Sequence, residues 1–158
     1  LRAVCYNFHK VCSYGVVPTM KEIIKICIKG ESGYGCIEDA YHDRLVIVPD
    51  GMNYEYLPAV ESEINPKRKW KYTTSSPLYE ELYKKIAKMV AEIINAEITE
   101  KCTDIGGIEF QITYADKSKV KKVYWVSGDC FAELFELIKQ IVPECEYTSA
   151  GLLRSVDE

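Results

Sequence analysis

The chain has 158 residues, 47% of them hydrophobic and 28% charged, which is ordinary for one globular domain that builds its own core. Its formal net charge of −4 argues against general electrostatic attraction to nucleic acid or to anionic membranes, although a local basic patch could still act. No apolar run approaches the roughly twenty residues that span a bilayer, and the beginning of the chain lacks the layout of a signal peptide. We therefore expect a cytoplasmic protein that does not enter a membrane.

Residues 1–19 fit the remainder of the chain poorly, because they show neither helical nor strand periodicity. Met20 is followed by Lys21, Glu22 and an isoleucine-rich segment, an arrangement typical of a translation start. We interpret residues 1–19 as an extension of doubtful nativeness and residues 20–158 as a single α+β domain.

The first half of this domain carries strand patterns. Residues 23–29 alternate between isoleucine and a Lys or Cys side chain, which predicts a half-buried strand. Residues 44–48 are apolar on both faces, as in a central strand, and Pro49-Asp50-Gly51 is a strong turn signal. The predicted strands of this half are residues 23–29, 44–48, 52–57 and 68–74, the last of them an edge strand.

The clearest pattern in the chain covers residues 76–96. Apolar residues recur there at three- and four-residue steps, so they form one stripe of a helix with charged residues on the opposite side. Ser76 is expected to cap the helix, and Pro77 suits the first helical position. The segment predicts a long amphipathic helix that lies on an apolar surface.

The second half follows a similar plan in less space. Residues 108–114 alternate between apolar and polar side chains, and residues 120–126 form a further strand after a turn. A second amphipathic helix begins at Ser127-Gly128-Asp129 and is stopped by Pro143.

These elements predict an α+β fold in the order ββββαββα. We expect a mainly antiparallel sheet of about six strands with two amphipathic helices packed on one face, followed by a C-terminal segment on the surface. A shift of 52 residues superposes residues 79–83 on residues 131–135, which is compatible with a diverged internal repeat and also with chance matching.

Seven cysteines lie at positions 5, 12, 27, 36, 102, 130 and 145, without the paired spacing of a disulfide framework or a zinc ribbon. We interpret most of them as reduced core thiols. Cys5, His9 and Cys12 have ligand-type spacing, but a structural zinc site needs four donors and no fourth is evident. No metal and no cofactor is therefore predicted.

The leading functional hypothesis is a small regulatory or binding module that engages a protein partner. Twelve tyrosines are present, and with both helices on one side the other face of the sheet is left open. We predict a partner-binding surface that uses this open face together with the strand that contains Trp70, since such rings suit interfaces. Its residues are Tyr54, Tyr56, Trp70 and Tyr72. The alternative is that tyrosine simply favours half-buried strands.

The second hypothesis is nucleic-acid binding through the basic aromatic strand 67–72. Its Lys67, Arg68, Lys69 and Lys71 could hold phosphates while neighbouring rings stack on bases. The structural alternative is an edge strand whose lysines block association with another sheet, while Trp70 packs partly into the core.

A cysteine-dependent enzyme is the third hypothesis. Cys36 and His42 are a local thiol and imidazole, and Cys130 lies in the first turn of the second predicted helix, where the helix dipole favours a thiolate. The neighbouring Asp129 opposes that thiolate. No residue set matches a catalytic template, so an enzyme is the less favoured interpretation.

Overall fold

The computed structural model describes residues 21–98 and 105–142. The predicted N-terminal extension, the Cys5, His9 and Cys12 set and the C-terminal surface segment lie outside these residues.

The strands of this part of the chain form one antiparallel sheet of six strands in the order β4-β3-β2-β1-β5-β6. They are β1 (Ile23–Glu31), β2 (Tyr41–Val48), β3 (Gly51–Pro58), β4 (Arg68–Thr73), β5 (Ile108–Tyr114) and β6 (Lys119–Tyr124). The first four strands form a meander, and β5 pairs with the other side of β1, so β1 and β2 are central while β4 and β6 are the edges.

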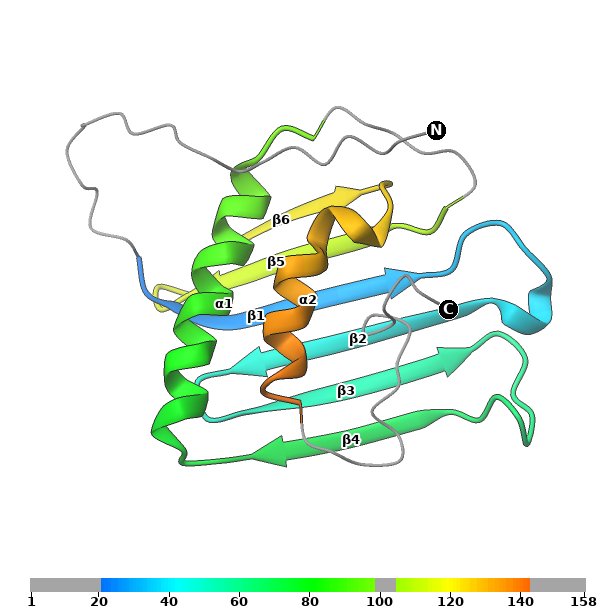
Figure 1. Ribbon diagram of the computed structural model, residues 1–158, viewed down its shortest axis with the longest axis horizontal. Coiled ribbons are helices and arrows are strands. Elements are labelled where there is room, and N and C mark those ends of the chain that lie inside the picture. The colour runs from blue at the N-terminus through cyan, green and yellow to red at the C-terminus, as the bar shows by residue number, and fades with distance from the viewer. Residues whose placement is uncertain (1–20, 99–104, 143–158) are drawn as a thin grey trace.

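Two α-helices, α1 (Pro77–Asn95) and α2 (Ala132–Lys139), cross the same face of the sheet (Figure 1). The chain order therefore confirms the predicted ββββαββα plan and the α+β class. Two short 3₁₀ turns add to it, η1 (Ile37–Asp39) in the β1–β2 connection and η2 (Gly128–Phe131) before α2. The suspected internal repeat is not shown by this arrangement.

The core lies between the sheet and the helices. Ile26 and Ile28 of β1 pair with Ile47 and Leu45 of β2, and all four side chains are buried. The helices contribute the other layer of the core. Its buried side chains include Ile86, Val90 and Ile94 of α1 and Leu134 and Ile138 of α2. Burial of these apolar side chains is the main stabilising contribution to the fold.

The ends of the helices differ from prediction in detail. Ser76 occupies the N-cap position of α1, but its hydroxyl makes no capping hydrogen bond, and Pro77 begins the helix as expected. The second helix was expected from residue 127 onward. Instead η2 comes first, because the Ser127 hydroxyl accepts a hydrogen bond from the Asp129 N–H and holds a tight turn there, and α2 begins at Ala132.

Candidate functional site

The tyrosines predicted for the open face lie on the helix-covered face. Tyr54 is 1% exposed and Tyr56 is 6% exposed, and Tyr54 sits opposite the buried Leu45 in the β2–β3 register. The prediction that Tyr54 and Tyr56 lie on the open face is therefore wrong. The physical reason is that the aromatic residues of β3 alternate with Asn53 and Glu55, and the helices cover the aromatic set.

Tyr54 has a structural role in that layer. Its hydroxyl donates a hydrogen bond of 2.9 Å to Oδ2 of Asp43, while the N–H of Gly30 donates one of 3.0 Å to Oδ1. Asp43 is a buried carboxylate at 4% exposure. Burial, together with the nearby Asp43 charge, raises the pKa of Tyr54 far above its ordinary value, so the hydroxyl stays protonated and remains a donor.

Trp70 and Tyr72 of β4 also point toward the helix side and are partly buried. The Trp70 ring lies 5.6 Å from that of Tyr54, and the Tyr72 ring lies 6.2 Å from that of Tyr79 on α1. Both rings therefore belong to the border of the core. For Trp70 this is the structural alternative that the sequence offered, whereas Tyr72 was expected on the open face.

The basic residues of the alternative site point in two directions. Arg68 lies on the helix side, with its guanidinium 5.5 Å from the centre of the Tyr56 ring. Lys67 pairs with Glu61 at 3.0 Å in the loop before β4. Lys69 and Lys71 are exposed on the opposite side of the sheet, so the structure splits the predicted basic cluster.

We call the side of the sheet that lies opposite α1 and α2 the open face. Strand alternation and register place seven basic residues on it, and these are Lys25, Lys29, Arg44, Lys69, Lys71, Lys119 and Lys121. The same registers place three carboxylates there, and these are Glu31, Glu55 and Glu109. The face thus carries an excess of positive charge on a chain whose net charge is −4.

The charges of the open face form cross-strand rows. One row runs through five adjacent strands and consists of Lys69, Glu55, Arg44, Lys29 and Glu109. Within it the ammonium group of Lys69 is 3.3 Å from Glu55, and that of Lys29 is 2.6 Å from Glu109. The hydrogen bond from Lys29 holds the pKa of the Glu109 carboxyl below its usual range.

Four of the seven basic residues of this face form no ion pair with any residue in the described ranges 21–98 and 105–142. These are Lys25, Arg44, Lys71 and Lys119. Lys121 shares Glu109 with Lys29 at a longer distance of 3.5 Å. The face therefore presents cations that an acidic surface could pair with.

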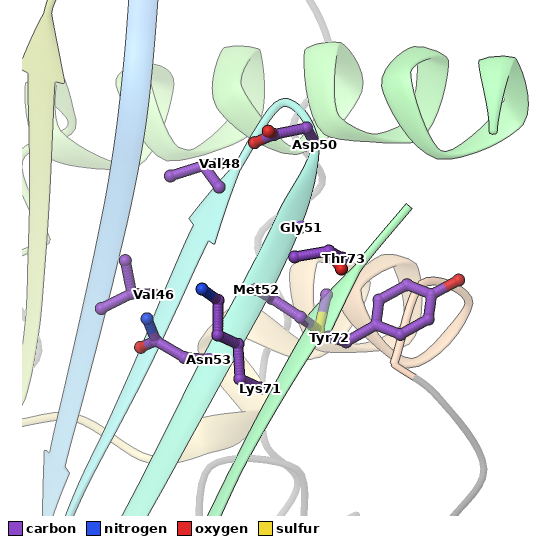
Figure 2. A pocket seen from close by; sticks show the side chains of 9 residues that line it. All are labelled: Val46, Val48, Asp50, Gly51, Met52, Asn53, Lys71, Tyr72 and Thr73. Atoms are coloured by element: carbon purple, nitrogen blue, oxygen red, sulfur yellow. The ribbon is translucent and has the colours of Figure 1, made fainter. Parts of the chain in front are cut away.

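A shallow pocket opens at one end of the open face, beside the β2–β3 turn (Figure 2). Its volume is about 150 Å³. The lining residues are Val46, Val48, Asp50, Gly51, Met52, Asn53, Lys71, Tyr72 and Thr73. The register explains the hollow, because Gly51 stands between Val48 and Thr73 and has no side chain to fill the space.

The β1–β2 and β3–β4 connections, at the other ends of these strands, are acidic where the open face is basic. Tyr34 is 93% exposed in the β1–β2 connection, and Ile64 is 92% exposed in the β3–β4 connection. The two connections touch, since the N–H of Ala59 donates to the carbonyl of Ala40 at 2.7 Å (Figure 1). Their charged residues are mostly acidic, and these are Glu38, Asp39, Glu61, Glu63 and Lys67. The molecule therefore separates a basic face from an acidic, partly apolar loop end.

The three cysteines within the described residues, Cys27, Cys36 and Cys130, form no recognisable catalytic site with their neighbours. Cys36 is exposed, and no hydrogen bond joins it to His42, whose Nδ1 lies 3.8 Å from Oε2 of Glu31. Cys130 is exposed in η2, beside Asp129. Cys27 is buried beneath the open face, where it contacts Arg44 and contributes to raising the pKa of that guanidinium. The thiol chemistry of these residues stays a prediction.

No protein-family model matches the chain, and a search of the curated proteins finds no match either. Within the described residues, no cluster of three or more potential metal ligands occurs, and no helix is long and apolar enough to cross a membrane.

Sequence reasoning predicted an open face but assigned aromatic residues to it and missed the charged residues that occupy it. Alternation indicates which residues share a face only within one strand. Only the register brings Lys29, Arg44 and Lys69, from three different strands, into one row.

Proposed function

We propose that this protein is a binding module whose open face receives an acidic surface of a protein partner. The observation that supports the proposal is the concentration of cations on one flat face of an acidic chain. Charge complementarity of this kind steers association and selects partners, and it weakens as salt concentration rises.

The dimensions of the face suit a protein partner. Six strands at a spacing of about 4.8 Å, each rising about 3.3 Å per residue, make a surface on the order of 25 Å by 20 Å in projection. The projected area is therefore on the order of 500 Å², which corresponds to the small, transient class of protein interface, at less than ~600 Å² per partner. The 150 Å³ pocket is too small to enclose a typical drug-sized ligand, so a flat partner is favoured over a small molecule.

A second candidate is a nucleic acid bound through the same lysines. The favouring observation is that cations on β4 and β6 lie at both edges of the face, so a phosphate backbone could cross it. Two features weigh against this candidate. Carboxylates interrupt the central row, and the aromatic stacking platform typical of single-strand binders is not built from Tyr54, Tyr56 or Trp70, which point toward the helices.

The test compares captured material from nuclease-treated and untreated lysates of the native host. The baits are the wild-type chain, the double variant Lys119→Glu/Lys121→Glu on the open face, and the matched control Lys85→Glu/Lys88→Glu on the exposed side of α1. Both variants change the net charge equally, so a general charge effect would act on both. We expect a stoichiometric protein with wild type and control, and loss of most of it with the open-face variant.

Two outcomes would contradict the proposal. Equal capture by the open-face variant would place the interaction elsewhere on the molecule. Captured material that disappears on nuclease treatment would instead support nucleic-acid binding by the open face. That binding should weaken steeply as the salt concentration rises.

A further inference from the structure

The pocket on the open face has a charged end and an apolar wall. Asn53 lies between Val46 and Lys71 in the strand register, and Gly51 lies between Val48 and Thr73. In Figure 2 the Lys71 side chain extends toward Val46 and Asn53, while Met52 and Tyr72 point away from these groups. The polar side-chain groups that line the hollow are thus the Lys71 ammonium, an amide, a hydroxyl and the Asp50 carboxylate, beside two valines.

Gly51 maintains this hollow for a steric reason. A Cβ added to Gly51 would lie 2.3 Å from the carbonyl oxygen of Tyr72, a distance that real Cβ atoms do not show. Glycine at this position therefore permits the close approach of β4 to β3 and leaves the space above it empty. The strand packing at Gly51 therefore determines this part of the pocket.

The charges of the pocket lie apart from each other. Asp50 is at the β2–β3 turn, beside Val48, and Lys71 is beside Asn53 on the far side of Gly51 (Figure 2). Lys71 has no ion-pair partner among the residues that the structure describes, whereas Lys29, Lys69 and Lys121 on the same face each pair with a glutamate. A ligand carboxylate would therefore be attracted to the Lys71 end and repelled from the Asp50 end.

We propose that this pocket is the anchor site of the open face and takes a glutamate side chain of the partner. The carboxylate pairs with Lys71 and accepts hydrogen bonds from the Asn53 amide and the Thr73 hydroxyl. The two methylene groups of the glutamate contact Val46 and Val48, and Asp50 is left to accept an N–H of the partner's backbone. Anchors of this kind, a side chain in a preformed pocket at a flat interface, contribute a large share of binding energy. This inference rests on the proposed function, because the anchor belongs to the same face.

The test uses two short peptides and NMR spectroscopy of the isotopically labelled full chain. The probes are the blocked tripeptides acetyl-Gly-Glu-Gly-amide and acetyl-Gly-Gln-Gly-amide, which differ in the charge of one side chain. We expect saturable shifts of the Asn53, Lys71 and Thr73 amide signals with the Glu peptide at millimolar concentration. The Gln peptide is expected to bind about fivefold more weakly or not at all, as loss of one exposed ion pair implies.

Variants separate the pocket from the general charge of the face. Lys71→Gln should weaken binding of the Glu peptide by about fivefold, whereas Lys119→Gln, an exposed lysine at the opposite edge, should bind it as wild type does. Equal responses to the two peptides, an unaffected Lys71→Gln variant, or the absence of a saturable shift would each overturn the anchor. The capture experiment uses Lys119 and Lys121, which do not line the pocket, so the anchor can fail while the open face keeps its partner.

Discussion

The two faces of the sheet are built from alternate residues of the same strands, yet they have opposite physical characters. On β1, Ile26 and Ile28 are fully buried under the helices, whereas Lys29 one residue further along is exposed. On β5 the buried Phe110 and Ile112 flank Gln111, which lies on the open face. One face therefore supplies most of the core, and the other carries the charged side chains that we propose for recognition.

This difference also explains how the edges are protected. Both edge strands carry lysines that point to the open face, Lys69 and Lys71 on β4 and Lys119 and Lys121 on β6. Edge lysines discourage pairing with a second sheet, because a neighbouring edge would bury or crowd the charges. The same lysines thus keep the sheet edges apart from other sheets and supply the positive charge that we assign to recognition.

The largest expected effect on stability comes from a substitution in the core, between the helices and the sheet. Ile86 of α1 is 0% exposed, and Ile86→Ala should lower the free energy of unfolding by about 2–5 kcal/mol, because it removes buried methyl groups and leaves a cavity. The control Lys88→Ala on the exposed side of the same helix should change it by less than ~0.5 kcal/mol. Urea unfolding followed by circular dichroism measures both values. Similar losses for the two variants would mean that the helix does not pack on the sheet as described.

A smaller loss of stability is expected when the buried hydrogen bond between Tyr54 and Asp43 is removed. Tyr54→Phe keeps the ring but removes the hydroxyl that donates to the buried Asp43. We expect a loss of about 1–3 kcal/mol in the free energy of unfolding, since a buried carboxylate loses one donor. Tyr114→Phe is the matched control, because no hydrogen bond of the Tyr114 hydroxyl to a described residue is seen. A Tyr54→Phe variant as stable as this control would show that the Asp43 contact contributes nothing.

A third prediction concerns the open face and depends on pH. The pKa of Glu109 is lowered in the folded protein by Lys29, so its contribution to stability is present above the usual Glu pKa of about 4.3 and is lost as pH falls through the folded-state value. Glu109→Gln should therefore cost up to ~1 kcal/mol near neutral pH, and the difference from wild type should vanish in acid. Unfolding curves collected across the acidic range measure it. A difference that grows as pH falls would have the wrong sign for this ion pair.

Much of the fold could be predicted, because local periodicity determines it. The three- and four-residue steps of residues 76–96 correspond to α1 within one residue at each end, and the Pro49-Asp50-Gly51 turn joins β2 to β3 as expected. In β4, Arg68, Trp70 and Tyr72 alternate with the exposed Lys69 and Lys71, as the two-residue repeat of a strand requires.

The site could not be predicted in the same way, because alternation groups residues by face without saying which face the helices cover. For Tyr54 and Tyr56 the physics favoured burial, since the alternate residues Asn53 and Glu55 are polar and better suited to water. The rows of charge and the hollow above Gly51 depend on register between strands far apart in sequence. Such register follows from the whole packed sheet and not from any one segment.

The most direct test of the open face is the acetylation rate of each lysine, measured by mass spectrometry in the free protein and in its complex with the captured protein partner. The two faces then act as controls for each other within one molecule. We predict that binding slows acetylation of Lys71, Lys119 and Lys121 and leaves that of Lys84, Lys85 and Lys88 on α1 unchanged. Protection of the α1 lysines, with the open-face lysines still reacting at their free rates, would contradict the account.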